Sequence, residues 1–348
     1  MLPCMGVVLK HCHHFARRSA DSSQNIMVVQ GSFRTAGLLF ACLAASAGGT
    51  RAEPVPAAPE HAKVTQDAAK LGTLIAPGAP LRKLAGGLKF TEGPVWLPFG
   101  GGCLIFSDIP GDELKQWSAA GGLKSFRHPS HHANGNAIDR AGRLITCEHG
   151  GRRVSILEKD GSVRTLIDRY EGKRLNSPND VIVKSDGTIW FTDPPYGLPP
   201  NEAKEVEGNY VYCFDPGTGD LKVVARDFDM PNGLCFSPDE EKLYVSDSGQ
   251  SRQVRVFAVQ SDHTLRGGAE FCRIEAGVPD GIRCDARGDV YVSAADGIHI
   301  FGPDGGMIGR VLVPETTTNL CFGGADGKTI FITAGTSIYS IQVLVPGR

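Results

Sequence analysis

The chain has 348 residues and a formal charge of −2, with 36 Lys and Arg against 38 Asp and Glu. This balance argues against a nucleic-acid partner, because nucleic-acid-binding proteins carry a clustered basic excess. Hydrophobic residues make up 41% of the chain, as in a folded globular protein, and no apolar run reaches the roughly 18 residues of a membrane-spanning helix.

Segment 1–52 is predicted to be a signal or leader. Arg34 precedes the apolar stretch 36–47 (AGLLFACLAASA), and small residues follow it, which is the order of a secretory signal. A start at Met27 would give the signal an ordinary length, so the true start is expected there. We therefore expect a periplasmic or secreted protein. A lipoprotein signal at Cys42 is less favoured, and an N-terminal helix packed on the domain is the remaining alternative.

Residues 53–80 are rich in Ala and Pro and are expected to lead into the fold without a core element. The catalytic domain is expected to span 81–348. Its seven cysteines are odd in number and form no C-x-x-C motif, which argues against a disulfide framework and a zinc site. We expect most of them to be small buried hydrophobes, although one disulfide stays open for an exported protein.

One pattern recurs six times: a turn residue or charge, then alternating apolar residues, often ending in Ser or Thr and Asp. The copies start 40, 45, 54, 47 and 40 residues apart, at Gly102, Gly142, Gly187, Glu241, Gly288 and Lys328. Their alternation predicts a strand, and a second apolar strand and a turn precede most copies. Six repeats of about 45 residues match propeller blades. The sequence therefore predicts an all-β protein, a six-bladed β-propeller of four-stranded blades.

Every repeat carries a polar residue at the head of its first strand. These residues are Glu92, Asn134, Asn179, Asn232, Asp280 and Asn319. The first strand of a propeller blade lines the central channel, so the six side chains are expected to form a ring at one end of it. All six offer oxygen, the ligand that hard divalent cations prefer, and two carboxylates would balance the double charge. The competing interpretation is six unrelated turns, because Asn-Gly and Asp-Gly are common turn formers.

The residues just after each second strand are expected to return to the mouth of this ring. They are Asp108, Glu148, His149, Asp193 to Tyr196, Asp247, Ser248 and Asp296. His149 is a candidate for proton transfer, since a free imidazole has a pKa near 6.5; the alternative is a histidine on a surface loop. The charged stretch 201–207 is a candidate lid beside Tyr196.

Four motifs in this order resemble the gluconolactonase/regucalcin family of metal-dependent propeller lactonases. They are FTEGPVW at 90–96, NSPND at 176–180, PNGL at 231–234 and PDG at 279–281. The strings TCEHG at 146–150 and FTDPPYG at 191–197 are similar to the bacterial gluconolactonase branch. The resemblance runs from about Leu81 to Pro346.

The resemblance implies a six-bladed fold with one catalytic divalent cation. Its metal ligands fall on Glu92, Asn232 and Asp280, and its N-D asparagine falls on Asn179 as a further ligand or a substrate contact. Animal members place a sugar-binding arginine two residues earlier, where this chain has Ser177. The all-oxygen ligands favour calcium, with zinc, magnesium and manganese as alternatives.

The expected reaction is hydrolysis of a sugar lactone, such as glucono-1,5-lactone, to its acid. The cation would polarise the lactone carbonyl, and Asp280 or His149 would activate the attacking water. Substrate contacts are expected from Asn134, Asn179, Tyr196 and Asn319. The alternatives are a hydrolase of another lactone or of a phosphotriester, and a non-enzymatic propeller that binds calcium or another ligand.

Overall fold

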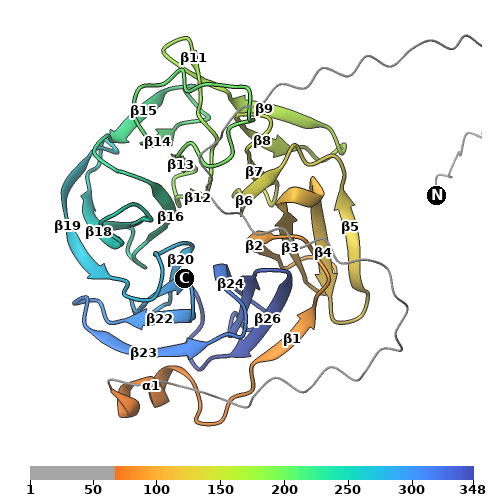
Figure 1. The fold of residues 1–348 in the computed structure, drawn as a ribbon, viewed down its shortest axis with the longest axis vertical. Helices are drawn as coiled ribbons and strands as arrows, with labels where there is room; N and C mark the ends of the chain where they lie inside the picture. Colours follow the sequence, from red (N-terminus) through yellow and green to blue (C-terminus); the bar gives the residue numbers. More distant parts are fainter. Residues whose placement is uncertain (1–66) are drawn as a thin grey trace, which may run out of the picture. The chain divides into compact units, whose positions relative to one another are not determined.

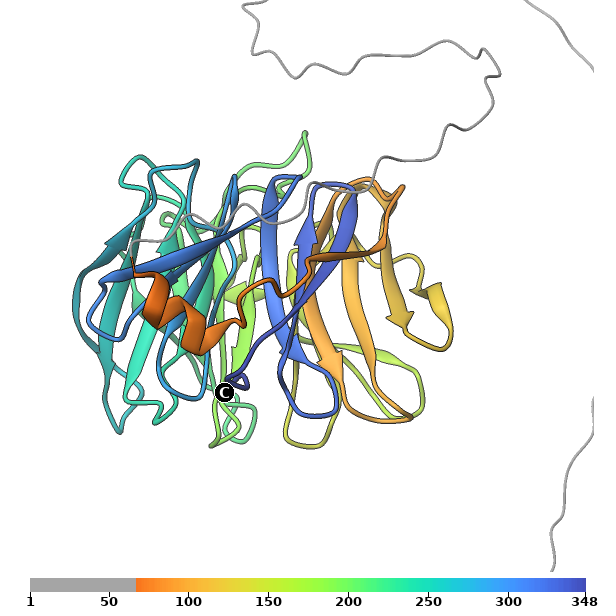
Figure 2. The same cartoon turned by 90° about the horizontal axis from the view of Figure 1, so that it is seen from below.

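The computed structural model describes residues 67–348. The predicted signal within 1–52, and residues 53–66, lie outside the described residues. Six four-stranded antiparallel sheets surround a central channel (Figure 1). Their strands run along the channel, and the connecting loops gather at its two ends (Figure 2). The predicted six-bladed propeller is confirmed.

The first three blades follow the chain, from the innermost strand outward. Blade 1 consists of β2 (Thr91–Leu97), β3 (Cys103–Asp108), β4 (Glu113–Ser118) and β5 (Gly122–Arg127). Blade 2 consists of β6 (Ala133–Ile138), β7 (Leu144–Glu148), β8 (Arg153–Leu157) and β9 (Val163–Ile167). Blade 3 consists of β12 (Val181–Val183), β13 (Ile189–Asp193), β14 (Tyr210–Phe214) and β15 (Leu221–Ala225).

The last three blades repeat this order until the ring closes. Blade 4 consists of β16 (Pro231–Phe236), β17 (Lys242–Asp247), β18 (Gln253–Val259) and β19 (Leu265–Arg273). Blade 5 consists of β20 (Ile282–Cys284), β21 (Val290–Ala294), β22 (Gly297–Phe301) and β23 (Met307–Leu312). Blade 6 consists of β24 (Thr317–Gly323), β25 (Thr329–Ala334), β26 (Ser337–Gln342) and β1 (Arg82–Ala85).

Three small elements lie between or beside the blades: the 3-10 turn η1 (Ile109–Gly111), the hairpin β10 (Arg169–Tyr170) with β11 (Lys173–Arg174), and the helix α1 (Ala68–Leu74). Asp67 caps α1 by accepting the Lys70 N–H at 2.8 Å. Leu71 and Leu74 of α1 are buried in the cluster that also holds Ile308 of β23. The structure differs here from the expected leader 53–80, because α1 contributes apolar side chains to the core.

The core consists of six apolar clusters, each between two neighbouring blades. Alternation in the second strands explains this arrangement, because successive side chains point to opposite faces of a blade and meet both neighbours. On β13, for example, Trp190 packs toward blade 4 and Phe191 toward blade 2. The seven cysteines of the described chain are all free and buried, as expected.

Hydroxyl groups near the ends of the second strands link one blade to the next. Ser107 donates to the carbonyl of Asn134 at 2.6 Å, and Thr192 donates to that of Asn232 at 2.7 Å. Ser293 of blade 5 donates to Thr318 of blade 6 at 2.7 Å. Each bond of this kind contributes about 1 kcal/mol. The Ser or Thr that ends the repeated pattern therefore fixes the inner strands against each other.

Candidate active site

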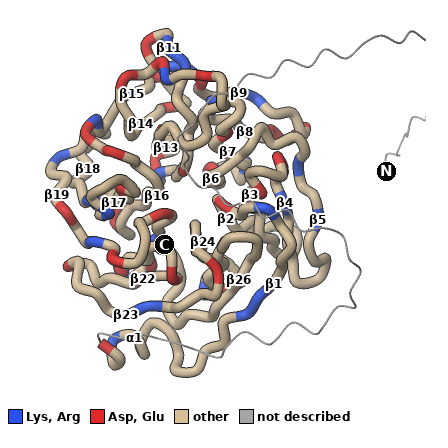
Figure 3. The backbone as a smooth tube through the Cα atoms, viewed as in Figure 1, with Lys and Arg blue, Asp and Glu red and all other residues tan. Residues whose placement is uncertain are grey.

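The six strand-head residues all lie at one end of the channel. Glu92, Asn134, Asn232 and Asn319 lie at the start of inner strands, and Asn179 and Asp280 lie two residues before β12 and β20. Five of them are buried and Asp280 is half-buried. Acidic positions border the central opening beside β2 and β16, while many Lys and Arg positions lie on the outer part of the blades (Figure 3).

Glycines after the ring residues allow the inner strands to approach at this level. A Cβ added to Gly135 would lie 2.5 Å from the carbonyl oxygen of Asn179, and one added to Gly281 would collide with the Asn319 side chain. The Gly135 N–H donates to the same Asn179 oxygen at 2.8 Å. The close spacing of the ring therefore depends on the absence of side chains at these positions.

The two carboxylates of the ring are destabilised in their charged form. Burial raises the pKa of Glu92 to about 7, against the lowering effect of the hydrogen bond from Gly93 N–H. Burial also raises the pKa of Asp280 well above its usual value, and the charge of Glu92 raises it further. Two carboxylates that repel each other in a desolvated channel form a site that gains stability from a cation.

Two ring oxygens are fully buried and lack a hydrogen-bond donor in the described part of the chain: Asn232 Oδ1 and Asp280 Oδ1. The orientation of Asn232 is fixed, because its Nδ2 donates to Ser248 Oγ at 3.0 Å. Ser248 Oγ in turn donates to the carbonyl of Pro279 at 2.6 Å, next to Asp280. A buried acceptor without a partner costs about 1–3 kcal/mol, which a bound cation would offset.

These residues fit a hard divalent cation. The set offers two carboxylates and up to four carboxamide oxygens, the donors that calcium and magnesium take. Within residues 67–348, no three His, Cys, Asp or Glu side chains gather in a way that could hold a metal ion. Carboxamide oxygens must therefore complete any coordination sphere here.

A buried ion pair, which the sequence analysis missed, lies next to the ring. Asp180 Oδ2 accepts a hydrogen bond from Arg283 Nη1 at 3.2 Å, and Asp180 Oδ1 accepts the Val181 N–H at 2.9 Å. The charge of Asp180 raises the pKa of both Glu92 and Asp280, and Arg283 lowers that of Glu92. The fully ionised group of three carboxylates and one guanidinium therefore carries a charge of −2.

His149 is buried rather than on the surface of a loop, with 6% of the residue exposed. Its Nε2 lies 3.3 Å from Asn134 Nδ2 of the ring. Burial, and then the charge of His132, lower the pKa of His149 to about 4. The imidazole is therefore neutral at pH 7 and can accept a proton.

The turn at 194–197 packs against His149 and carries Tyr196 to the mouth of the site. A Cβ added to Gly197 would collide with the imidazole ring. Ser177 Oγ accepts the Gly197 N–H at 2.9 Å and donates to the Pro194 carbonyl at 2.6 Å. Ser177 is fully buried in these bonds, so it supports the turn and does not take the place of a sugar-binding arginine.

Tyr196 is 43% exposed, and its hydroxyl donates to the Met230 carbonyl at 3.4 Å. Burial of the hydroxyl raises the pKa of Tyr196, and the charge of nearby Asp280 raises it further. The phenol therefore lies beside the ring, where it can contact a ligand.

The charged stretch 201–207 is tied to the protein by ion pairs. Arg152 Nη1 binds Glu202 at 2.7 Å, and Arg152 Nε donates to the carbonyls of Leu175 at 2.8 Å and Asn176 at 3.1 Å. The Arg152 side chain is 2% exposed. The guanidinium of Arg152 therefore joins the stretch 201–207 to the loop that leads to Asn179. Arg152 itself follows His149 by three residues. Its action as a lid stays a prediction.

The second strands end at the level of the ring, as expected, since Asp108 pairs with Thr91 and Asp247 with Pro231, but five acidic side chains at these ends are engaged elsewhere. Asp108, Asp193 and Asp247 accept backbone N–H groups of Phe90, Asn176 and Met230, and so hold the loops that enter their own blades. Glu148 binds Arg127 and Arg153, and Asp296 binds His299 and Arg310. Of these stretches, His149, Tyr196 and Ser248 contact or lie beside ring residues.

Comparison with known proteins gives consistent matches. Residues 90–336 match the family model described as the SMP-30/Gluconolactonase/LRE-like region. The chain is 33% identical over 308 residues to a gluconolactonase of Zymomonas mobilis, covering 80% of this chain and 86% of the relative. It is 27% identical over 256 residues to the pentonolactonase XacC of Haloferax volcanii, covering 70% and 81%.

A solved structure shares the fold in detail. The gluconolactonase of Xanthomonas campestris superposes with a TM-score of 0.75 at 34% identity, covering 82% of this chain and 98% of that one. In the described part of the chain, 67–348, no helix is both long and apolar enough to cross a membrane.

Proposed function

Since the chain belongs to the SMP-30/gluconolactonase/LRE-like family, we propose that it is a lactone hydrolase that opens sugar lactones with the aid of one divalent cation. The observation that carries the proposal is the pair of unpartnered oxygens, Asn232 Oδ1 and Asp280 Oδ1, at the channel end that also holds the buried carboxylate of Glu92. The gluconolactonase and pentonolactonase names of the relatives support a sugar lactone as substrate.

Glu92, Asn232 and Asp280 would hold the cation, with Asn179 as a further ligand. Calcium is the favoured ion because all these donors are oxygens, and zinc, magnesium and manganese are the alternatives. When bound, the ion supplies Lewis-acid polarisation of the lactone carbonyl and stabilises the developing negative charge.

The chain's own residues supply orientation and proton transfer. The neutral imidazole of His149, or the carboxylate of Asp280, takes a proton from the attacking water. The hydroxyl adds to the carbonyl carbon, the bond from that carbon to the ring oxygen breaks, and the ring oxygen takes up a proton. Asn134, Asn179, Asn319 and Tyr196 would hold substrate hydroxyl groups.

The favoured substrate is glucono-1,5-lactone or a related aldonolactone. A six-membered lactone already hydrolyses in water, so modest stabilisation of the transition state suffices for catalysis. The site offers carboxamides, a phenol and an imidazole rather than a deep apolar pocket, which suits a hydroxylated ring.

The proposal is tested by a pH-stat assay on aldonolactones after chelation, with single metals added back. We expect activity to vanish with the chelator and return with one divalent metal, and Glu92→Gln and Asp280→Asn to lose at least about a hundredfold in kcat/KM. Asp296→Asn is the control, since Asp296 binds His299 and Arg310 away from the ring. Full metal-dependent activity in both ring variants would overturn the assignment. Metal binding without turnover of any lactone or phosphotriester would favour a binding protein instead.

We also propose export, from the signal pattern at 36–47. Fractionation of cells that express the whole chain, compared with a variant lacking 1–52, tests this. Export of the whole chain alone is the expected result, and equal cytoplasmic retention of both would contradict it.

A further inference from the structure

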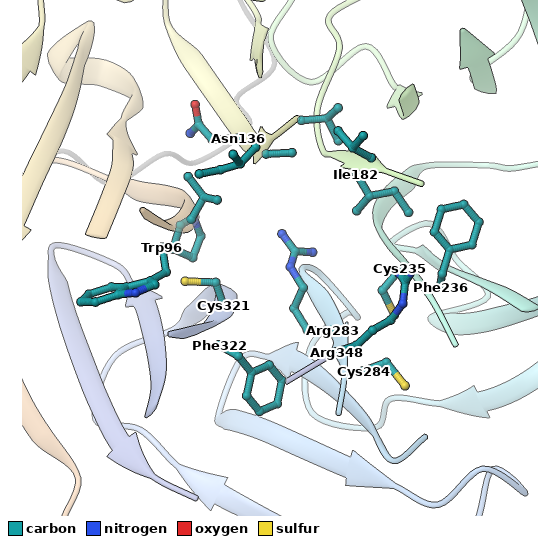
Figure 4. A pocket seen from close by; sticks show the side chains of 16 residues that line it. Trp96, Asn136, Ile182, Cys235, Phe236, Arg283, Cys284, Cys321, Phe322 and Arg348 are labelled. Carbon is teal, nitrogen blue, oxygen red and sulfur yellow. The ribbon is translucent and has the colours of Figure 1, made fainter. Parts of the chain in front are cut away.

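The central channel ends, away from the ring, in a cavity of about 280 Å³. All six inner strands contribute to its wall, and most of the residues that line it are of apolar type (Figure 4). Trp96, Phe236 and Phe322 form part of this wall together with aliphatic side chains and cysteines. The mechanism proposed above uses none of these apolar side chains.

The charged residues that line this cavity are both arginines. Arg283 and Arg348 are its charged lining residues, and no Asp or Glu of residues 67–348 lines it. Arg348 is ion-paired with Glu240 and stacks over the ring of Phe236. Arg283 extends from β20 towards the middle of the cavity, as Figure 4 shows. Arg283 is itself paired with Asp180 through Nη1, so what it offers a ligand is the rest of its guanidinium.

The hydrogen bonds of Arg283 leave one edge of its guanidinium unused. Its bonds to Asp180 at 3.2 Å, Ile282 at 2.7 Å and Leu234 at 3.5 Å all come from Nη1. In the described chain, Nε and Nη2 of Arg283 donate to no protein acceptor. Neither nitrogen is fully buried, so both keep some exposed surface. These N–H groups are therefore accessible from the cavity.

We propose that this cavity is a second ligand site, separate from the lactone site, which binds a small carboxylate with an apolar body. The free edge of a guanidinium matches the two oxygens of a carboxylate, and charge-assisted bonds of this kind are the strong ones. The apolar residues of the wall suit an aromatic or branched body. A polyhydroxylated acid fits poorly, because the amide of Asn136 already bonds to Gly93, Ser107 and Asn134.

The test is titration calorimetry of benzoate into the whole protein. We expect saturable binding that weakens at least tenfold in Arg283→Gln. Arg273→Gln is the matched control, because Arg273 pairs with Glu270 on the exposed face of blade 4, and it should bind benzoate as the wild type does. Benzamide, which has the same shape without the charge, should bind at least tenfold more weakly than benzoate.

A second variant keeps the arginine intact, because Arg283 also neutralises Asp180 and its loss can destabilise the fold. Val183→Phe adds a ring to the cavity wall from β12 and should abolish benzoate binding with a circular dichroism spectrum like that of the wild type. No saturable binding by the wild type, wild-type binding by both variants, or tighter binding of gluconate than of benzoate would each overturn the proposal. Asp280→Asn should keep benzoate binding while it loses lactonase activity, so the two proposals fail separately.

Discussion

Ser248 orients Asn232: its hydroxyl accepts the Asn232 Nδ2–H at 3.0 Å and leaves Oδ1 of the same carboxamide without a donor. The carboxamide would otherwise be free to rotate and present its N–H₂ group to the ring. A side chain of blade 4 that touches no cation thus decides whether Asn232 can serve as an oxygen donor.

Ser248→Ala should therefore lower the affinity for the activating cation about tenfold, with little change in melting temperature. Second-shell partners of metal ligands typically have effects of this size. Ser246→Ala is the matched control, since the buried Ser246 hydroxyl has no partner in residues 67–348. The measurement is activity against free metal concentration. An unchanged midpoint in Ser248→Ala would contradict this role.

His149 should act as a base over an unusually wide pH range. Its pKa is lowered to about 4, so the imidazole is proton-free above that pH and becomes charged below it. At saturating metal, kcat/KM should rise with pH through about 4 and show no further His149 step near 6.5. His149→Asn should lose about 10²–10⁴-fold in kcat/KM. A profile that keeps its low-pH limb in this variant would assign that limb to another group.

Gly197→Ala should displace the imidazole, because an added Cβ would collide with the ring of His149. Forced overpacking of this kind costs about 1–3 kcal/mol, and we expect a fall of at least tenfold in kcat. Gly72→Ala is the control: nothing lies within 4 Å of a Cβ at this position of α1. Equal activity in the two variants would show that the turn at 194–197 does not position His149.

The ion pair of Arg152 with Glu202 should hold the stretch 201–207 over its neighbours. Glu202→Gln removes one charge of a pair at 2.7 Å whose other member is buried. We expect faster amide hydrogen exchange in 198–209 and a raised KM with kcat largely retained. Glu207→Gln, which removes a carboxylate with no ion pair in the described chain, should change neither. If KM is unmoved while exchange accelerates, the stretch does not act as a lid.

Closure of the propeller should depend on pH through Glu315. Burial opposes its ionisation, but hydrogen bonds from Tyr339 and Thr336 and the ion pair with Lys83 prevail and lower its pKa to about 2. A carboxylate with a lowered pKa stabilises the fold above its unfolded value near 4.5, and this contribution disappears as the pH falls towards about 2. Glu315→Gln should lower the melting temperature by a few degrees at pH 7, and the difference should shrink between pH 4.5 and 2. A constant difference across that window would exclude the linkage.

The blades and the ring could be predicted because each depends on a regular period. Alternation predicts a strand wherever it occurs, and the repetition of the pattern every 40 to 54 residues places Glu92 and Asp280 at equivalent strand heads. Residues without a repeated counterpart were missed. Arg283 and Asp180 are 103 positions apart, and only the closed ring brings them together.

The strand-end acids were misinterpreted for a related reason. Asp108 and Asp247 end their strands, where a site residue would be expected. The carboxylate of each instead accepts a backbone N–H from the loop that enters its own blade. The position of a residue in the repeat predicts at which end of the channel it lies, but not where its side chain points. The helix α1 was overlooked because Leu71 and Leu74 alone give a weak helical period. Packing of these two side chains on β23 stabilises the helix.

The antiparallel pairing of β1 with β26 has a consequence for biosynthesis. Arg82 pairs with Ser340. The strand β1, which is synthesised before the other described strands, therefore cannot pair until β26, the last of them, has been synthesised. Contacts between such distant segments form slowly, because a long loop must close before they can be gained. On the ribosome, the nascent protein would therefore remain an open arc of blades until almost its whole length had emerged.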